Sequence, residues 1–161
     1  MPDTVQDARN AAGIRYGPLE GSLGFLLRLS QLHSFAAFYR RLGQFDIKPG
    51  EISVLMMIGE NPGIRQGLLA RTLMIKRAHM TKMIRVMEDA GLVTRTVPED
   101  DRRSVELWLT EPGRAMLDRL TPSFLEHEAH TGGTLTRTEE ETLKRLLRKY
   151  IDFDAAGKDA P

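Results

Sequence analysis

Residues 65–90 (RQGLLARTLMIKRAHMTKMIRVMEDA) constrain the fold more than any other part of the chain. Apolar residues recur there at helical spacing over residues 65–72 and again over residues 76–90, with only three residues between the two patterns. Gly91 follows the second pattern and fits the left-handed position that commonly ends a helix. A short helix, a three-residue turn and a longer helix together predict a helix-turn-helix unit.

The second of these helices has one apolar and one largely basic face. Its apolar positions share one side: Met80, Met83, Ile84 and Met87. Its opposite side carries Arg77, Thr81, Lys82 and Arg85. The whole chain has a net charge of +1, but residues 64–97 hold seven Lys or Arg and two acids, a local charge of +5. Such an asymmetry is typical of a nucleic-acid-binding module, although a solvated charged surface is the commoner cause of a single cluster.

A hairpin pattern follows the second helix directly. Residues 93–97 have the composition of a strand, and Val105, Leu107 and Leu109 alternate with other residues in a second strand. The polar tip PEDDRR lies between them, and Thr110 precedes a helix that starts at Glu111. The order predicts a wing at about residues 92–109, attached to a helix-turn-helix at about residues 65–90.

Further helices flank this core. Residues 20–42 are apolar around much of the predicted helix, so it must be buried on more than one side, either in a core or against a second subunit. Pro49 suits the first turn of a helix that ends at the Asn-Pro-Gly cluster of residues 61–63. Thr138 and Glu141 have the spacing of a capping box and predict the start of the last helix. The tail from residue 154 is expected to fray.

These elements predict a mainly α protein with a small β-hairpin wing (α+β), a winged helix-turn-helix core flanked by N- and C-terminal dimerisation helices. We expect a single domain over residues 1–161. Its parts are the flanking dimerisation helices and the DNA-binding lobe: about residues 20–45 and 111–152 for the helices, and about residues 49–110 for the lobe.

Composition excludes several classes of function. The chain has no cysteine, which rules out disulfides, thiolate nucleophiles and thiol-based sensing. No apolar run approaches the ~20 residues that span a bilayer, and the first 13 residues do not resemble a signal peptide, so we expect a cytoplasmic protein without a membrane partner. No catalytic Ser-His-Asp order, phosphate loop or metalloprotease motif is present, so we do not expect an enzyme or a cofactor.

Three motifs in order resemble the MarR family of bacterial transcriptional regulators: LLARTLMI, then TKMIRVMEDAGLVTR, then DRRSVELWLTEPG. The resemblance runs from about residue 23 to residue 150. It implies an obligate homodimer that binds pseudo-palindromic double-stranded DNA and is usually released by a small molecule bound between its dimerisation and DNA-binding parts. The sequence departs from the pattern at Met74, where such turns often hold a small residue, and at Lys76, where a Ser or Asp cap is usual.

The resemblance places the second helix of the helix-turn-helix in the major groove. Cationic and polar side chains there can bond base edges, or phosphate in the case of Arg85; the candidates are Lys76, Arg77, His79, Thr81, Lys82 and Arg85. The wing candidates are Arg95, Asp101, Arg102 and Arg103, where Arg103 matches the family's minor-groove arginine. Asp101 is expected to orient one of the two guanidinium groups beside it. The alternative is a charged turn that only prevents edge aggregation.

The predicted effector pocket lies among the first, second and fifth helices, near the dimer junction. Aromatic walls and cations on the first of them suit an aromatic carboxylate or an acidic thioester: His33, Phe35, Phe38, Tyr39, Arg40 and Arg41. The alternative is that the aromatic residues form dimer core and the arginines are solvated. Trp108 is expected to pack on a neighbouring element rather than to line a pocket. The methionines at positions 56, 57, 74, 80, 83 and 87 are expected to be adaptable core.

Two alternatives to a ligand-responsive repressor remain open at this point. A constitutive or architectural DNA-binding protein would carry the same DNA-binding surface and sense nothing. A metal-responsive repressor is conceivable because EHEAH places His127 and His130 three residues apart, but without cysteine or further clustered histidines we assign no metal site.

Overall fold

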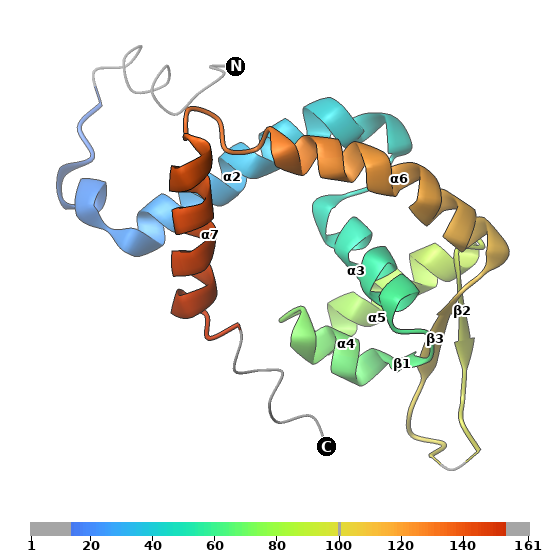
Figure 1. The fold of residues 1–161 in the computed structure, drawn as a ribbon. Helices are drawn as coiled ribbons and strands as arrows, with labels where there is room; N and C mark the ends of the chain where they lie inside the picture. The colour runs from blue at the N-terminus through green and yellow to red at the C-terminus, as the bar shows by residue number, and fades with distance from the viewer. Residues whose placement is uncertain (1–13, 100, 154–161) are drawn as a thin grey trace. The chain divides into compact units, whose positions relative to one another are not determined.

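The computed structural model describes residues 14–99 and 101–153 of the chain, so the amino-terminal segment, Asp100 and the tail predicted to fray lie outside the described residues. The fold is mainly helical with a small sheet, as expected (Figure 1). The elements are, in order, η1 (Gly17–Gly21), α2 (Leu23–Leu42), η2 (Gly43–Phe45), α3 (Pro49–Glu60), β1 (Ile64–Arg65), α4 (Gln66–Thr72), α5 (Arg77–Asp89), β2 (Val93–Thr96), β3 (Glu106–Leu109), α6 (Glu111–Ala129) and α7 (Arg137–Tyr150).

The chain divides into two compact units, Met1–Leu125 and Glu126–Pro161. The first unit contains the helix-turn-helix, the sheet and most of α6. The second contains the end of α6, the turn after it and α7. The single-domain organisation expected from the sequence stays a prediction.

One apolar core holds the first unit together. Buried side chains come from α2, the loop before α3, α3, α4, α5, two strands and α6: Phe38, Leu42, Ile47, Ile52, Val54, Leu55, Ile58, Leu69, Ala70, Met80, Met83, Ile84, Met87, Val93, Leu107 and Leu120. The predicted apolar face of α5 is confirmed, since its four residues are all in this set. Burial of each of the larger side chains in this set stabilises the fold by about 1.5–3 kcal/mol before entropy is counted.

The methionine prediction was wrong at one position. Met56 and Met57 pack against the core, but Met74 is 92% exposed. Met74 lies in the turn between α4 and α5 and has a left-handed backbone with φ of 54°. This turn conformation directs its side chain to solvent, so helical spacing does not apply to it.

The three strands form an antiparallel sheet in the order β1-β3-β2. Ile64 pairs with Leu107 in one ladder, and Val93 pairs with Leu109 in the other. The wing is therefore confirmed, but β1 was not predicted because two residues are too few to show alternation. Figure 1 shows the hairpin of β2 and β3 projecting from the helices around it.

Trp108 packs on a neighbouring element, as expected. A Cβ added to Gly63 would lie 2.8 Å from its ring, so the indole occupies the space above this glycine. Gly63 has φ of 81°, which disfavours any other residue there. The indole Nε1–H donates to Thr96 Oγ1 at 3.0 Å, so Trp108 contacts both β2 and the residue that precedes β1.

The junction between the wing and α6 explains the spacing of Thr110 and Gly113. The Thr110 hydroxyl donates to the carbonyl oxygen of Gly91 at 2.5 Å and accepts from the Gly113 N–H at 3.0 Å. A Cβ on Gly113 would lie 1.9 Å from the carbonyl oxygen of Leu92. The threonine therefore caps α6, and only glycine allows this close approach of helix and hairpin.

Most predicted helix ends are correct within one or two residues. Gly91 has φ of 70°, which confirms its left-handed position after α5. The first long helix starts at Leu23 rather than residue 20, because Ser22 caps it by accepting from the Phe25 N–H.

The predicted start of the last helix was wrong by two residues. The capping box is formed by Thr136 and Glu139: the Glu139 carboxylate accepts from the Thr136 N–H at 2.8 Å. Thr138 and Glu141 have the same spacing, but Glu141 instead accepts from Arg137 at 3.1 Å, one turn earlier on the exposed surface. The earlier box adds residues 137 and 138 to the helix.

Candidate nucleic-acid interface

The exposed face of α5 carries the predicted DNA-binding side chains. Each candidate is exposed while the opposite face is buried: Lys76, Arg77, His79, Thr81, Lys82 and Arg85. Three further apolar positions lie in or beside this surface and are also exposed, namely Ala78, Val86 and Met74. Because no acidic residue precedes Glu88 on this helix, the exposed surface is basic over its first three turns.

The beginning of α5 is left open to an anion. Lys76 is the N-cap residue and its side chain makes no capping hydrogen bond to the helix. The first turn contains no acidic residue, so Lys76 and Arg77 lie at the positive end of the helix dipole without an acid beside them in that turn. This arrangement is mildly unfavourable in the free protein and favourable beside a phosphate.

Thr81 is engaged within the protein. Its hydroxyl donates to the carbonyl oxygen of Arg77 at 3.0 Å and accepts from Gln66 Nε2 at 3.1 Å. Gln66 is the first residue of α4. The two helices of the helix-turn-helix are therefore joined through Thr81, a side chain that the sequence singled out as a DNA-contact candidate.

The wing tip is organised by Asp101. Its carboxylate accepts from the Arg103 N–H at 3.1 Å and from the Ser104 hydroxyl, and it lies 3.6 Å from Arg65 Nη1. The hydrogen bonds, from Ser104 and then from the Arg103 backbone, lower the pKa of Asp101 below its ordinary value, and the Arg65 charge adds to this. The carboxylate is therefore the form that holds this turn.

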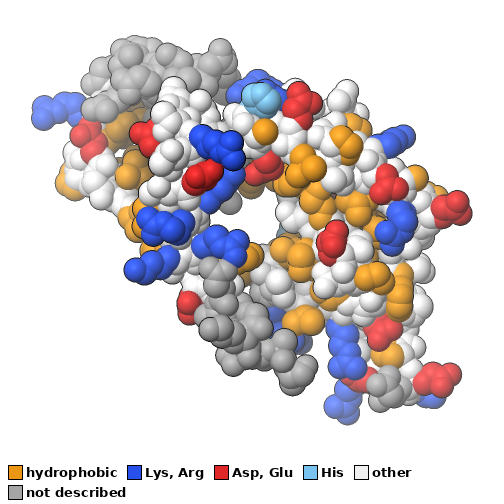
Figure 2. All heavy atoms as spheres, viewed as in Figure 1, with side chains coloured by type: hydrophobic (Ala, Val, Ile, Leu, Met, Phe, Trp, Pro, Cys, Tyr) orange, Lys and Arg blue, Asp and Glu red, His pale blue; other side chains and the backbone are white. Residues whose placement is uncertain are grey.

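This geometry corrects one expectation about the wing. The ion pair that the described residues give Asp101 is with Arg65 at the start of the helix-turn-helix, rather than with the guanidinium of Arg102 or Arg103. Both wing arginines are exposed. Figure 2 shows Lys and Arg side chains gathered beside the end of the wing, with acidic side chains next to them.

Arg95, the fourth wing candidate, forms an ion pair near the stem of the wing. Its Nη2 lies 2.5 Å from Glu88 Oε2 in the last turn of α5. Both side chains are about one-third exposed, at 38% and 32%. Arg95 thus links β2 to α5 and places a cation near the negative end of that helix.

The predicted effector residues all lie on α2. Phe38 is buried and its ring meets Tyr39 edge to face with centroids 5.8 Å apart. The other five are exposed: His33, Phe35, Tyr39, Arg40 and Arg41. Their role in ligand binding stays a prediction.

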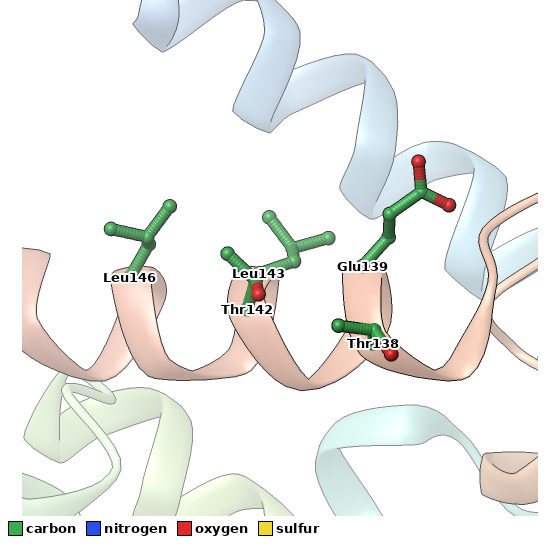
Figure 3. Close-up of a pocket in the computed structure, with 5 residues that line it drawn as sticks. All are labelled: Thr138, Glu139, Thr142, Leu143 and Leu146. Carbon is green, nitrogen blue, oxygen red and sulfur yellow. The ribbon is translucent and has the colours of Figure 1, made fainter.

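A shallow depression lies elsewhere, on the second unit. It has a volume of about 280 Å³ and is lined by Thr138, Glu139, Thr142, Leu143 and Leu146. Figure 3 shows that all five side chains belong to one helix, α7. A lining from one exposed helix does not enclose a small molecule, and its leucines belong to the apolar side of that helix.

The two histidines of the second unit contact their own segment. His127 is buried, with Nε2 3.3 Å from Thr131 Oγ1 and 4.0 Å from Glu128 Oε1. His130 Nδ1 lies 2.8 Å from the carbonyl oxygen of Glu126. Across residues 14–99 and 101–153 the structure has no group of three or more His, Asp or Glu placed to hold a metal ion.

In the same residues, 14–99 and 101–153, no helix is both long and apolar enough to cross a bilayer.

Sequence reasoning missed Arg65, Gln66 and Ser104. Arg65 counted only toward the local charge, and Gln66 is one polar residue at a helix start. The partners of Gln66 and Arg65 lie 15 and 36 positions away in the sequence, and no local pattern indicates such pairings. Ser104 bonds Asp101 only three residues earlier, but it is one polar residue in a polar turn.

The helix-turn-helix, the basic face of α5 and the antiparallel wing define a winged helix-turn-helix protein, a class that binds duplex DNA. The model of the MarR family matches residues 47–105. A protein named as the transcriptional regulatory protein for the hcr operon of Thauera aromatica is 31% identical over 145 residues, which cover 89% of this chain and 87% of that protein.

Solved structures agree with this relationship. The transcriptional repressor CouR bound to a 23-mer DNA duplex is 33% identical, with a TM-score of 0.80 over 86% of this chain and 98% of CouR. CouR bound to p-coumaroyl-CoA is 30% identical, with a TM-score of 0.78 over 86% of this chain and 97% of CouR. The chain belongs to the MarR family of transcriptional regulators.

Proposed function

We propose that the chain is a homodimeric transcriptional repressor that binds pseudo-palindromic duplex DNA and releases it when a small effector binds. The observation that carries the proposal is the exposed basic face of α5 beside an arginine-tipped wing. The similarity to CouR bound to a DNA duplex supports it. A helix of this diameter fits the major groove, and the wing reaches the adjacent minor groove.

Each part of the interface has a proposed role. Arg77, His79 and Lys82 address base edges, where Arg or Lys can bond guanine O6 and N7. Lys76 and Arg85 contact phosphates at the edges of the groove. Arg102 and Arg103 follow the minor groove, where cations meet an enhanced negative potential.

Exposed apolar side chains support the dimer. In α2 these include Leu23, Leu26 and Leu32, and in the second unit they include Leu146 and Tyr150 of α7. Every residue of α7 except Glu140 is exposed, although the helix's leucines recur at helical spacing. A helix with such an apolar stripe is stable in water when the stripe packs against another surface, and we assign that surface to a second copy.

The effector is proposed to be an aromatic acid or its coenzyme A thioester. The support is the similarity to CouR bound to p-coumaroyl-CoA, together with the aromatic and cationic side chains of α2. Phe35 and Tyr39 would contact the ring, and Arg40 or Arg41 the anionic groups.

Selection of bound fragments from a sheared library of the organism's own genome tests the proposal. Enriched duplexes should contain a pseudo-palindrome and bind two chains each, and fluorescence anisotropy should show release by an aromatic acid or its thioester. Failure to enrich any sequence would contradict sequence-specific binding. Enrichment without release by any compound of this class would favour the constitutive DNA-binding alternative.

A further inference from the structure

Arg65 and Gln66 connect three parts of the first unit. They lie where β1 passes into α4. Arg65 pairs with Glu106 on β3, and the Gln66 N–H donates to the carbonyl oxygen of Val105 at 2.8 Å. The backbone of this dipeptide is therefore attached to the second strand of the wing.

The side chain of Arg65 extends this connection to the wing tip. Its guanidinium lies 3.6 Å from the Asp101 carboxylate, which itself accepts from the Arg103 N–H and the Ser104 hydroxyl. One carboxylate thus joins the start of the helix-turn-helix to the turn that carries the proposed minor-groove arginines. The pair is partly exposed, so its strength depends on geometry and on these additional hydrogen bonds.

The side chain of Gln66 extends in the other direction, to the recognition helix. Its amide donates to Thr81 Oγ1 at 3.1 Å, and the Thr81 hydroxyl donates to the Arg77 carbonyl oxygen at 3.0 Å. The hydroxyl hydrogen of Thr81 and one lone pair of its oxygen are therefore already used in hydrogen bonds within the protein. Thr81 is poorly suited to read a base while this bond is in place.

We propose that Arg65 and Gln66 are positioning residues that set the wing tip and the recognition helix relative to each other, with Thr81 acting through Gln66. This inference rests on the proposed function. A helix in the major groove and a wing in the minor groove bind together only if their separation matches the duplex, and pre-organisation of that separation increases affinity without adding a contact.

A double-mutant cycle in operator binding tests the Gln66–Thr81 connection. The probe is a duplex enriched from the organism's own genome, and the variants are Gln66→Met, Thr81→Val and the pair. Each single substitution should weaken binding about two- to tenfold, the range of one neutral hydrogen bond, and the pair should be no weaker than the worse single variant. Effects that multiply would show independent DNA contacts and overturn the proposal.

A conservative variant of Thr81 distinguishes loss of the Gln66–Thr81 hydrogen bond from a general loss of folding. Thr81→Ser keeps the hydroxyl and should bind like the wild type, whereas weakening equal to that of Thr81→Val would contradict the role of the hydrogen bond. Thermal unfolding followed by circular dichroism shows that each variant is folded at the temperature of the assay.

The Arg65–Asp101 connection can be tested with a substitution for which a pure charge effect and a positioning role predict opposite changes in DNA affinity. Asp101→Asn removes a negative charge near DNA, so charge alone would tighten binding. The positioning role predicts weaker binding, loss of the outer minor-groove protections in a hydroxyl-radical footprint, and no further loss when Arg65→Gln is added. Tighter binding by Asp101→Asn, or multiplied effects in the pair, would overturn it.

Arg114→Gln in α6 is the matched control for Arg65→Gln, because it makes the same charge change at an exposed arginine outside the helix-turn-helix and the wing. It should bind within about twofold of the wild type. Wild-type protein that enriches no duplex would refute the proposed function and this inference together. If the wild type binds its duplex but the affinity losses of the single variants multiply in each double variant, only the positioning role would be refuted.

Discussion

Replacement of Arg103 by alanine should weaken operator binding while leaving the fold intact. The Arg103 backbone N–H, not its side chain, donates to Asp101, so the cap of the wing turn survives the substitution. The side chain is exposed, and such substitutions change the free energy of unfolding by about 0.5 kcal/mol or less. Loss of a minor-groove or phosphate contact should lower affinity by about 1–3 kcal/mol for each wing, roughly five- to 150-fold per wing.

The salt dependence provides a second, independent readout. Each phosphate contact contributes about 0.9 to the slope of log K against log salt concentration, so loss of the two wings of a dimer should reduce the slope by roughly 2. Fluorescence anisotropy over a range of NaCl concentrations measures both quantities. Arg114→Ala serves as the control with the same loss of charge. Unchanged affinity and slope in Arg103→Ala would refute the placement of the wing on DNA.

Three further predictions concern the fold, the assembly and the wing turn. Gly113→Ala should lower the free energy of unfolding by about 3 kcal/mol or more, because the new methyl would lie 1.9 Å from the Leu92 carbonyl oxygen. Urea unfolding measures this change. A decrease of less than about 1 kcal/mol would show that the junction between the wing and α6 can shift. Leu146→Asp should convert the dimer to a monomer in sedimentation experiments and abolish operator binding with it, and an intact dimer would exclude this face of α7 from the interface. The pKa of Asp101 is lowered in the folded protein, so the stabilisation of the wing turn by its carboxylate should be complete above the ordinary aspartate pKa of about 3.9. This stabilisation should decline as the pH falls through the lower pKa of the folded state. NMR titration of the Asp101 carboxyl checks this, and an unshifted midpoint would contradict the hydrogen bonds from Ser104 and Arg103.

Local patterns were sufficient to predict the winged helix-turn-helix. The helical spacing of residues 65–90 corresponds closely to α4 and α5, and the buried face of α5 is the one expected. Gly91 takes its left-handed conformation because the end of α5 requires it. These features depend on neighbouring residues, so they are visible in the sequence.

The features that sequence reasoning missed depend on distant partners or on competition between equal local signals. Asp101 pairs with Arg65 rather than with the adjacent arginines because the turn brings Arg65 to it across the sheet. The two Thr-x-x-Glu spacings before α7 are locally equivalent, and the helix uses Thr136. Met74 matches the composition of the core, but its turn conformation exposes it.

The central claim is that the exposed face of α5 reads DNA sequence. Duplex selection from one random library should be carried out in parallel with the wild type and with a variant in which Arg77, His79 and Lys82 are all alanine. The account predicts that the wild type enriches a pseudo-palindromic consensus, whereas the folded variant retains only weak binding without sequence preference. Enrichment of the same consensus by the variant would contradict the account.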